Sequence, residues 1–167
     1  STVYNARTGG LIGMAEASTI SSSYATGAVS GTGQEVGGLI GFAGHSTIAT
    51  LITNCYATGS VSAKGYVGGL IGFSNLSPTV ISSSYATGEV TVASDGKAGG
   101  LVGLNQYAKI QNSYATGNLV GTSDYIGGLV GANSGTILYC YSVGAVASTQ
   151  ANTGGLIGFT TGGPVAA

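Results

Sequence analysis

One short sequence, Gly-Gly-Leu followed by Ile or Val and then Gly, recurs along the whole chain and constrains its fold more than any other feature. Successive copies start 28, 31, 31, 28 and 27 residues apart, and they begin at Gly9, Gly37, Gly68, Gly99, Gly127 and Gly154. A period of this length is typical of repeat architectures, in which each unit contacts only its neighbours. We therefore treat residues 1–167 as a single repeat domain.

A second motif, Tyr-Ala-Thr-Gly, alternates with the first. It begins at Tyr24, Tyr56, Tyr85 and Tyr114, and a weaker copy, Tyr-Ser-Val-Gly, begins at Tyr141. An Ile stands four residues before each Tyr, and a Val or Leu stands five residues after it. Lengths differ only after each Gly-Gly-Leu motif and before the next one, which predicts loops at those two places.

The segments of constant length are short, rich in Ile, Val, Thr and Tyr, and bounded by glycine, which is typical of strands. A helix is disfavoured because each interior glycine would cost about 1 kcal/mol. Collagen is excluded because glycine does not occupy every third position and the chain has only two prolines. The sequence therefore predicts an all-β fold.

A repeat with two or three short strands cannot bury its own apolar face, so it must stack on its neighbours. This predicts a β-solenoid of about five coils of 27–31 residues, with partial coils at both ends. Parallel coils lie about 4.8 Å apart, so equivalent residues form continuous ladders. Glycine is expected at the corners, where the chain needs positive φ or room for a neighbouring backbone.

The leucine of each Gly-Gly-Leu motif is predicted to form the core ladder of the solenoid. This ladder comprises Leu11, Leu39, Leu70, Leu101, Leu129 and Leu156. Because side chains alternate along a strand, Leu39 and its neighbour Ile40 are not both expected to point inward. The sequence leaves open which residue of each such pair faces the core.

These motifs resemble a known family of repeats. The segments Gly99-Gly-Leu-Val-Gly-Leu-Asn and Ile110-Gln-Asn-Ser-Tyr-Ala-Thr-Gly in particular resemble the GLUG repeat of bacterial surface proteins, which occurs in large adhesins and beside some secreted peptidases. The resemblance covers essentially all of the chain. It implies an extracellular or cell-surface location and a scaffold or adhesive role, with no catalytic residue in the repeat. The family pattern of Asn and Gly after the first motif is met at Asn133-Ser-Gly135, whereas Ala43-Gly-His45 and Ser74-Asn-Leu76 depart from it, so their turns are expected to differ.

The small number of charges excludes several partners. The chain has four Lys or Arg, five Asp or Glu and a net charge of -1. Binding of nucleic acid or of an anionic membrane surface is not expected, because both depend on clustered Lys and Arg. No apolar run approaches the roughly 20 residues of a membrane span. The first residues also lack the charged and apolar regions of a signal peptide, so we expect a mature or excised chain.

His45, Cys55 and Cys140 are the first candidates for chemistry. His45 is expected to be an exposed loop residue, because no nucleophile or carboxylate has an equivalent position. The two cysteines share the column before the motif Tyr and are three coils apart, roughly 14 Å at about 4.8 Å per coil. This exceeds the limit of about 7 Å between the Cα atoms of a disulfide. We predict two free thiols and no zinc site.

Carboxylates would be required if this solenoid cleaved polysaccharides. Asp95 and Asp124 lie in equivalent loops one coil apart, but Asp95-Gly-Lys97 is equally typical of a plain turn. Glu16, Glu35 and Glu89 occupy different columns. We therefore expect no enzymatic activity, no metal and no cofactor.

The motif tyrosines and the threonines two residues later are predicted to lie on one face of a strand. The threonines are Thr26, Thr58, Thr87 and Thr116, and Val143 ends their row. If this face is exposed, it offers a regular surface for a sugar or for ice; if it is buried, the two rows are ladders that stabilise stacking. Ice binding is the weaker alternative, because only one threonine column recurs per coil.

The ends complete the prediction. Neither end carries the polar cap that keeps repeat proteins monomeric, so we expect either a segment of a longer array or head-to-tail stacking of copies. The leading hypothesis is a structural subunit or stalk segment of an extracellular fibre or adhesin. The alternative is a carbohydrate-binding module that uses the tyrosine and threonine face.

Overall fold

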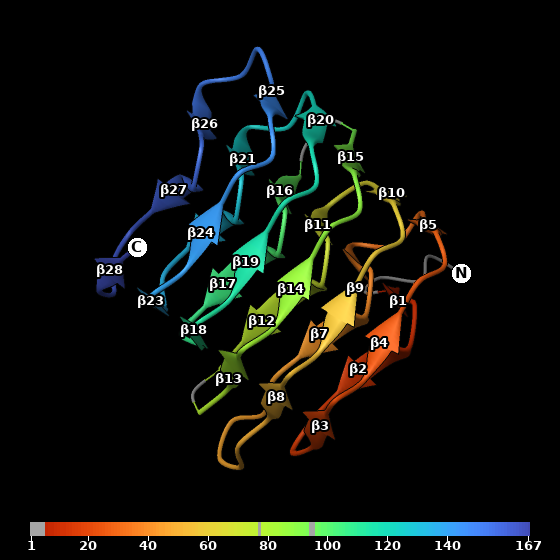
Figure 1. Ribbon diagram of the computed structural model, residues 1–167, viewed down its shortest axis with the longest axis vertical. Coiled ribbons are helices and arrows are strands. Elements are labelled where there is room, and N and C mark those ends of the chain that lie inside the picture. Colours follow the sequence, from red (N-terminus) through yellow and green to blue (C-terminus); the bar gives the residue numbers. More distant parts are fainter. Residues whose placement is uncertain (1–5, 77, 94–95) are drawn as a thin grey trace.

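The computed structural model describes residues 6–76, 78–93 and 96–167, and within them all regular structure is β-strand. Figure 1 shows short strands wound into coils that are stacked side by side, with β1 at one end of the stack and β28 at the other. The predicted β-solenoid of about five coils is confirmed. The expectation of two or three strands per coil is wrong, because corners and loops divide each coil into five strands.

Five parallel sheets, which we call A to E, each take one strand from every complete coil, and the partial last coil adds strands to sheets A, B and C only. Sheet A contains β1 (Arg7–Gly9), β6 (Glu35–Gly37), β11 (Tyr66–Gly68), β16 (Lys97–Gly99), β21 (Tyr125–Gly127) and β26 (Asn152–Gly154). Sheet B contains β2 (Ile12–Ala15), β7 (Ile40–Ala43), β12 (Ile71–Asn75), β17 (Val102–Gln106), β22 (Val130–Asn133) and β27 (Ile157–Thr160). Sheet C contains β3 (Thr19–Ser21), β8 (Leu51–Thr53), β13 (Val80–Ser82), β18 (Lys109–Gln111), β23 (Thr136–Leu138) and β28 (Val165–Ala166).

The two remaining sheets have five strands each. Sheet D contains β4 (Tyr24–Ala25), β9 (Tyr56–Ala57), β14 (Tyr85–Ala86), β19 (Tyr114–Ala115) and β24 (Tyr141–Ser142). Sheet E contains β5 (Val29–Gly31), β10 (Val61–Ala63), β15 (Val90–Val92), β20 (Leu119–Gly121) and β25 (Val146–Ala147).

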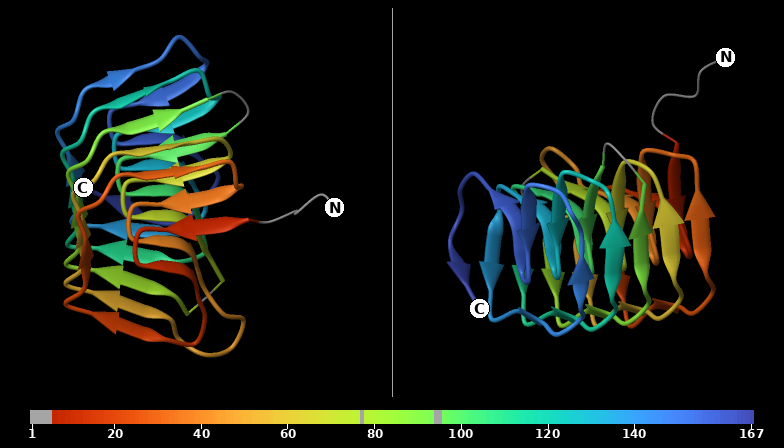
Figure 2. Two further views of the ribbon diagram at one scale, coloured as in Figure 1. Left: turned by 90° about the vertical axis from the view of Figure 1, so that its right-hand side faces the viewer. Right: turned by 90° about the horizontal axis from the view of Figure 1, so that it is seen from above.

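Equivalent residues of neighbouring coils lie opposite each other in the sheets. Gly9 pairs with Gly37 in sheet A, and Tyr24 pairs with Tyr56 in sheet D. Strands therefore run in layers from the first coil to the last, as the two views of Figure 2 show. The variable segments of the repeat lie in loops between these sheets, for example residues 44–50 between β7 and β8.

The corner between sheets C and D depends on a left-handed residue in every coil. The residue at this corner has a φ of 48° to 55°, and the five are Ser22, Asn54, Ser83, Asn112 and Tyr139. Asparagine is favoured in this conformation among residues other than glycine. The corner repeats in every coil without a glycine.

The interior contains two separate apolar clusters. The first is enclosed by sheets B, C and D and includes Leu70, Ile71 and Ile81. The second lies between sheets A and E and includes Val67 and Val90. Each coil therefore contributes to two narrow cores.

Between the two cores, opposite sides of each coil come into direct contact. We call this contact the waist. Here the second glycine of every Gly-Gly-Leu motif except the last faces the residue after the motif Tyr. A Cβ atom on Gly69 or Gly100 would lie 2.9 or 2.8 Å from the Cβ of Ala86 or Ala115, and it would also meet the carbonyl oxygen of the next coil's glycine. Only glycine fits the waist without a shift of backbone, so the two motifs of the repeat are the two sides of one contact.

The predicted leucine ladder lies in the first core. Leu39, Leu70, Leu101 and Leu129 are fully buried, and Leu156 is partly buried against the same cluster. Leu11 differs, because it heads the row and is 51% exposed.

The expectation that Leu39 and Ile40 cannot both face inward is wrong. Both are fully buried in the first core. The N–H groups of both residues donate to the same carbonyl oxygen, that of Leu70, so Leu39 lies in a corner before β7 and strand alternation does not apply to the pair.

We predict that Leu101→Ala destabilises the protein by about 2–5 kcal/mol, because it leaves a cavity in a closely packed core. Equilibrium urea unfolding followed by circular dichroism measures this cost. The control, His45→Ser, removes a side chain from a loop and is expected to have little effect. A cost below about 0.5 kcal/mol for Leu101→Ala would contradict the packing of this row.

The waist gives a second prediction, with a control at the same motif position. Gly100→Ala is expected to destabilise the protein by at least about 1–3 kcal/mol, because the new methyl group has no free space. Gly155 is the equivalent residue in the last coil, and a Cβ there would meet no atom within 4 Å. Gly155→Ala should therefore leave the free energy of unfolding almost unchanged in the same experiment. Equal losses of stability in the two variants would contradict the close contact at the waist.

Candidate functional site: the tyrosine and threonine face

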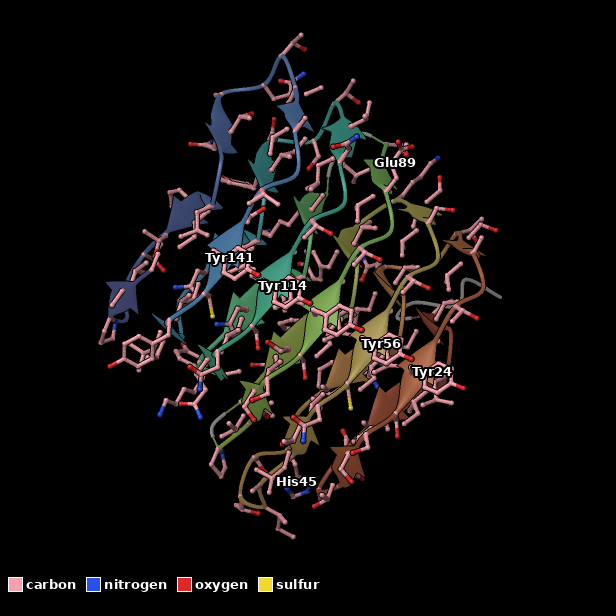
Figure 3. All side chains as sticks on the ribbon, viewed as in Figure 1. Tyr24, His45, Tyr56, Glu89, Tyr114 and Tyr141 are labelled. Atoms are coloured by element: carbon pink, nitrogen blue, oxygen red, sulfur yellow. The ribbon has the colours of Figure 1, made fainter. Side chains whose placement is uncertain are left out.

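The five motif tyrosines form one continuous stack along the outside of sheet D, which we call the tyrosine ladder (Figure 3). Neighbouring ring centroids are 4.9 to 5.0 Å apart, and the ring planes differ by only 2° to 5°. The spacing follows from the separation of parallel strands, because every ring takes the same position one coil further along.

Alternation along sheet D sends the tyrosines outward and the following residues inward to the waist. The three inner rings, Tyr56, Tyr85 and Tyr114, are half-buried, whereas the end rings Tyr24 and Tyr141 are 58% and 52% exposed. The difference arises because an inner ring is covered by two neighbours and an end ring by one.

The threonine row lies beside the ladder on the same outer face. Thr26, Thr58 and Thr87 are exposed, Thr116 is half-buried, and Val143 at the end of the row is 70% exposed. The structure thus brings the predicted tyrosine and threonine residues together on one accessible surface.

The position of Tyr114 in the ladder changes the pKa of its phenol. Burial raises the pKa of Tyr114, and the neighbouring phenols of Tyr85 and Tyr141 raise it further. Among the described residues, no side chain or backbone group hydrogen-bonds to a phenol oxygen of the ladder. These oxygens are also not among the buried groups without a partner, so they are open to solvent.

The other candidates for chemistry have local structural roles. His45 is half-buried, more than expected, and its Nδ1 accepts hydrogen bonds from the backbone N–H groups of Thr47 and Ile48 at 3.3 and 3.2 Å. Both hydrogen bonds lie within the loop between β7 and β8.

The carboxylates do not gather in the part of the chain that the structure describes. Asp95 lies outside the described residues, and Asp124 is exposed. Glu35 is buried and forms an ion pair with Arg7, with 2.6 Å between Oε2 and Nε. Within residues 6–76, 78–93 and 96–167, no three His, Cys, Asp or Glu side chains form a group that could hold a metal ion.

The prediction of two free thiols is confirmed, and both Cys55 and Cys140 are buried. Burial raises the pKa of the Cys140 thiol. Each sulfur contacts the carbonyl oxygen two residues earlier, as the hydroxyl of Ser84 does in the same column. The thiols therefore substitute for a structural serine.

Sequence reasoning missed a second group of polar and aromatic contacts, on the outer side of sheets A and B. The ammonium of Lys97 lies 4.8 Å from the ring centroid of Tyr66 and 5.3 Å from that of Tyr125. Arg7 lies 4.3 Å from the ring of Phe42. All of these residues except Phe42 stand two residues before a Gly-Gly motif, and this equal spacing was the signal that could have found them.

A buried polar ladder was also missed, at the end of the sheet B strands. Ser74 donates a 2.8 Å hydrogen bond to the side chain of Asn105, which in turn donates one of 2.8 Å to Asn133. Ser74, and not Asn75, thus occupies the asparagine position of its coil. The turns after the first motif differ from coil to coil, as expected from the sequence.

Comparison with known proteins gives one match. The model of the GLUG motif matches residues 32–62 and 96–120. The two segments are similar to this motif. Each matched segment includes a waist glycine, Gly38 or Gly100, and the alanine that faces it. The searches of curated proteins and of solved structures found no match to the chain.

The similarity to the GLUG motif and the β-solenoid together fit a repetitive structural module. In the described residues there is no helix with the length and apolar character needed to cross a membrane.

The ladder gives a prediction with an internal control. A stacked aromatic pair contributes about 0.5–1.5 kcal/mol beyond the burial of its surface. Tyr85→Ala removes two such pairs and Tyr24→Ala removes one, so Tyr85→Ala should lower the free energy of unfolding by about twice as much. Urea unfolding of both variants measures this ratio, and equal costs would mean that the rings do not stabilise one another.

Proposed function

We propose that this chain is a structural, non-enzymatic segment of an extracellular fibre or adhesin stalk. One observation carries the proposal: every coil pairs with the next in register through parallel sheets that run the length of the molecule. Such an array grows by adding coils, and each new coil uses the same contacts as the last.

The proposed function is mechanical, and three kinds of ladder support it. Backbone hydrogen bonds join the coils in all five sheets. The two apolar cores and the tyrosine ladder run parallel to these bonds, so bending or pulling a coil away disrupts all of them together. A rigid rod with variable loops is suited to hold other domains away from a surface.

The outer coils present apolar groups that the inner coils bury. Leu11 and Met14 of the first coil are 51% and 46% exposed, and Phe159 and Val165 of the last coil are 40% and 43% exposed. Strands β26, β27 and β28 extend sheets A, B and C at this end, so a further coil can pair along three of the five sheets. We infer that this coil belongs either to a second copy, stacked head to tail, or to neighbouring repeats of a longer chain.

Head-to-tail stacking predicts filaments that lengthen with protein concentration, and negative-stain electron microscopy and sedimentation velocity test for them. Leu11→Lys should abolish them, because it would place a charge where the preceding copy packs. Thr26→Lys adds the same charge on the side face of the same coil and should leave assembly intact. Monomers of the unaltered chain at every concentration would contradict stacking of copies and favour repeats within a longer chain.

A carbohydrate-binding module is the second candidate, favoured by the exposed threonines beside the tyrosine ladder. Sugars bind through hydroxyl hydrogen bonds and contacts with aromatic rings, and both groups recur here at every coil. Screening against a glycan array tests this candidate. Binding that is lost in folded Tyr85→Ala and kept in Tyr107→Ala, which changes an exposed ring outside the ladder, would support it; no binding by the unaltered chain would exclude this role.

A further inference from the structure

The tyrosine ladder places five oxidisable phenols in one line. The chain has ten tyrosines and no tryptophan, and both of its thiols are buried. Phenols are therefore the main accessible groups that can lose a single electron. In the ladder they are nearly parallel and 4.9 to 5.0 Å apart from Tyr24 to Tyr141, so their π systems face one another without a gap in the series.

We propose that the tyrosine ladder is a path for one-electron oxidation, along which a radical formed on one ring moves from coil to coil and is trapped at the exposed end rings. The oxidant is an external one-electron acceptor of the kind that oxidises phenols, such as the oxidised haem of a peroxidase supplied with hydrogen peroxide. This activity is independent of the structural function proposed above.

In each step of radical transfer, the phenols exchange their protons with water. The oxidant takes one electron from a phenol, and the phenolic proton passes to water, which leaves a neutral phenoxyl radical. The next tyrosine gives an electron to this radical and its own proton to water, while the first oxygen regains a proton from water. The radical has then moved one coil, and no group is consumed. Exchange with water is available because the ladder oxygens are open to solvent.

The ends of the ladder are where the radical meets other molecules. Tyr24 and Tyr141 have one free ring face each and are more than half exposed. There, two phenoxyl radicals from different copies can form a carbon–carbon bond between their ortho positions. In total, two phenols lose two electrons and two protons, which one hydrogen peroxide accepts to give two waters.

The test places the oxidant at one end of the ladder and detects the radical at the other. Ser21 is exposed and lies three residues before Tyr24, so a ruthenium polypyridyl photo-oxidant attached to Ser21→Cys starts the reaction at the first coil. The native thiols are 0% and 1% exposed and are not expected to be labelled. A flash with a sacrificial cobalt(III) acceptor forms the radical, and a nitroso spin trap marks its position for peptide mass spectrometry.

Spin-trap adducts are expected at Tyr141, which is four steps of 4.9 to 5.0 Å from Tyr24. In the same labelled chain, Tyr85→Phe keeps a ring in the stack but removes the phenol, so the adduct at Tyr141 should be lost. Tyr107→Phe removes a phenol outside the ladder and should leave the adduct at Tyr141 unchanged. Adducts confined to Tyr24 in the unaltered ladder, or adducts at Tyr141 that persist in Tyr85→Phe, would overturn the proposal.

Discussion

The contact at the waist determines how the rest of this structure is arranged. In four coils the second glycine of the Gly-Gly-Leu motif approaches the alanine that follows a motif tyrosine, and in a fifth coil Gly128 approaches Ser142, with no room for another side chain between them. Because the waist joins opposite sides of a coil, it divides the interior into two cores and keeps both narrow. It also explains why the two motifs alternate through the sequence: a coil that lacked either one could not close in the same shape.

In-register stacking imposes a second constraint, on charge. A charged residue in a column lies about 4.8 Å from its equivalents in the coils above and below, so like charges in one column would repel. In sheet A, Arg7 pairs with Glu35, and Lys97 lies between Tyr66 and Tyr125. Neutral residues tolerate this arrangement better than charged ones. The small number of charges in the chain is thus consistent with its architecture.

The period of the sequence was enough to predict the solenoid, its parallel stacking and the columns of the tyrosine and threonine face, because each depends on spacing alone. The number of strands per coil was not predictable, since strands of two to five residues lack an alternation long enough to recognise. The burial of both Leu39 and Ile40 depends on a corner that the sequence does not reveal. The buried ladder of Ser74 and Asn105 could not be predicted, because residue type alone matches Asn105 with the neighbouring Asn75 and not with Ser74.

The most direct test of the waist is the free energy of unfolding of Ala115→Val, measured by urea denaturation. Ala115 contacts the waist glycine of its own coil, so added methyl groups have no free volume, and a loss of about 1–3 kcal/mol is expected. Thr116→Val, which changes the adjacent outward residue, should remain close to the unaltered protein. If Ala115→Val were as stable as the unaltered protein, the waist would contain free volume, and close packing there would not determine the arrangement of the coil.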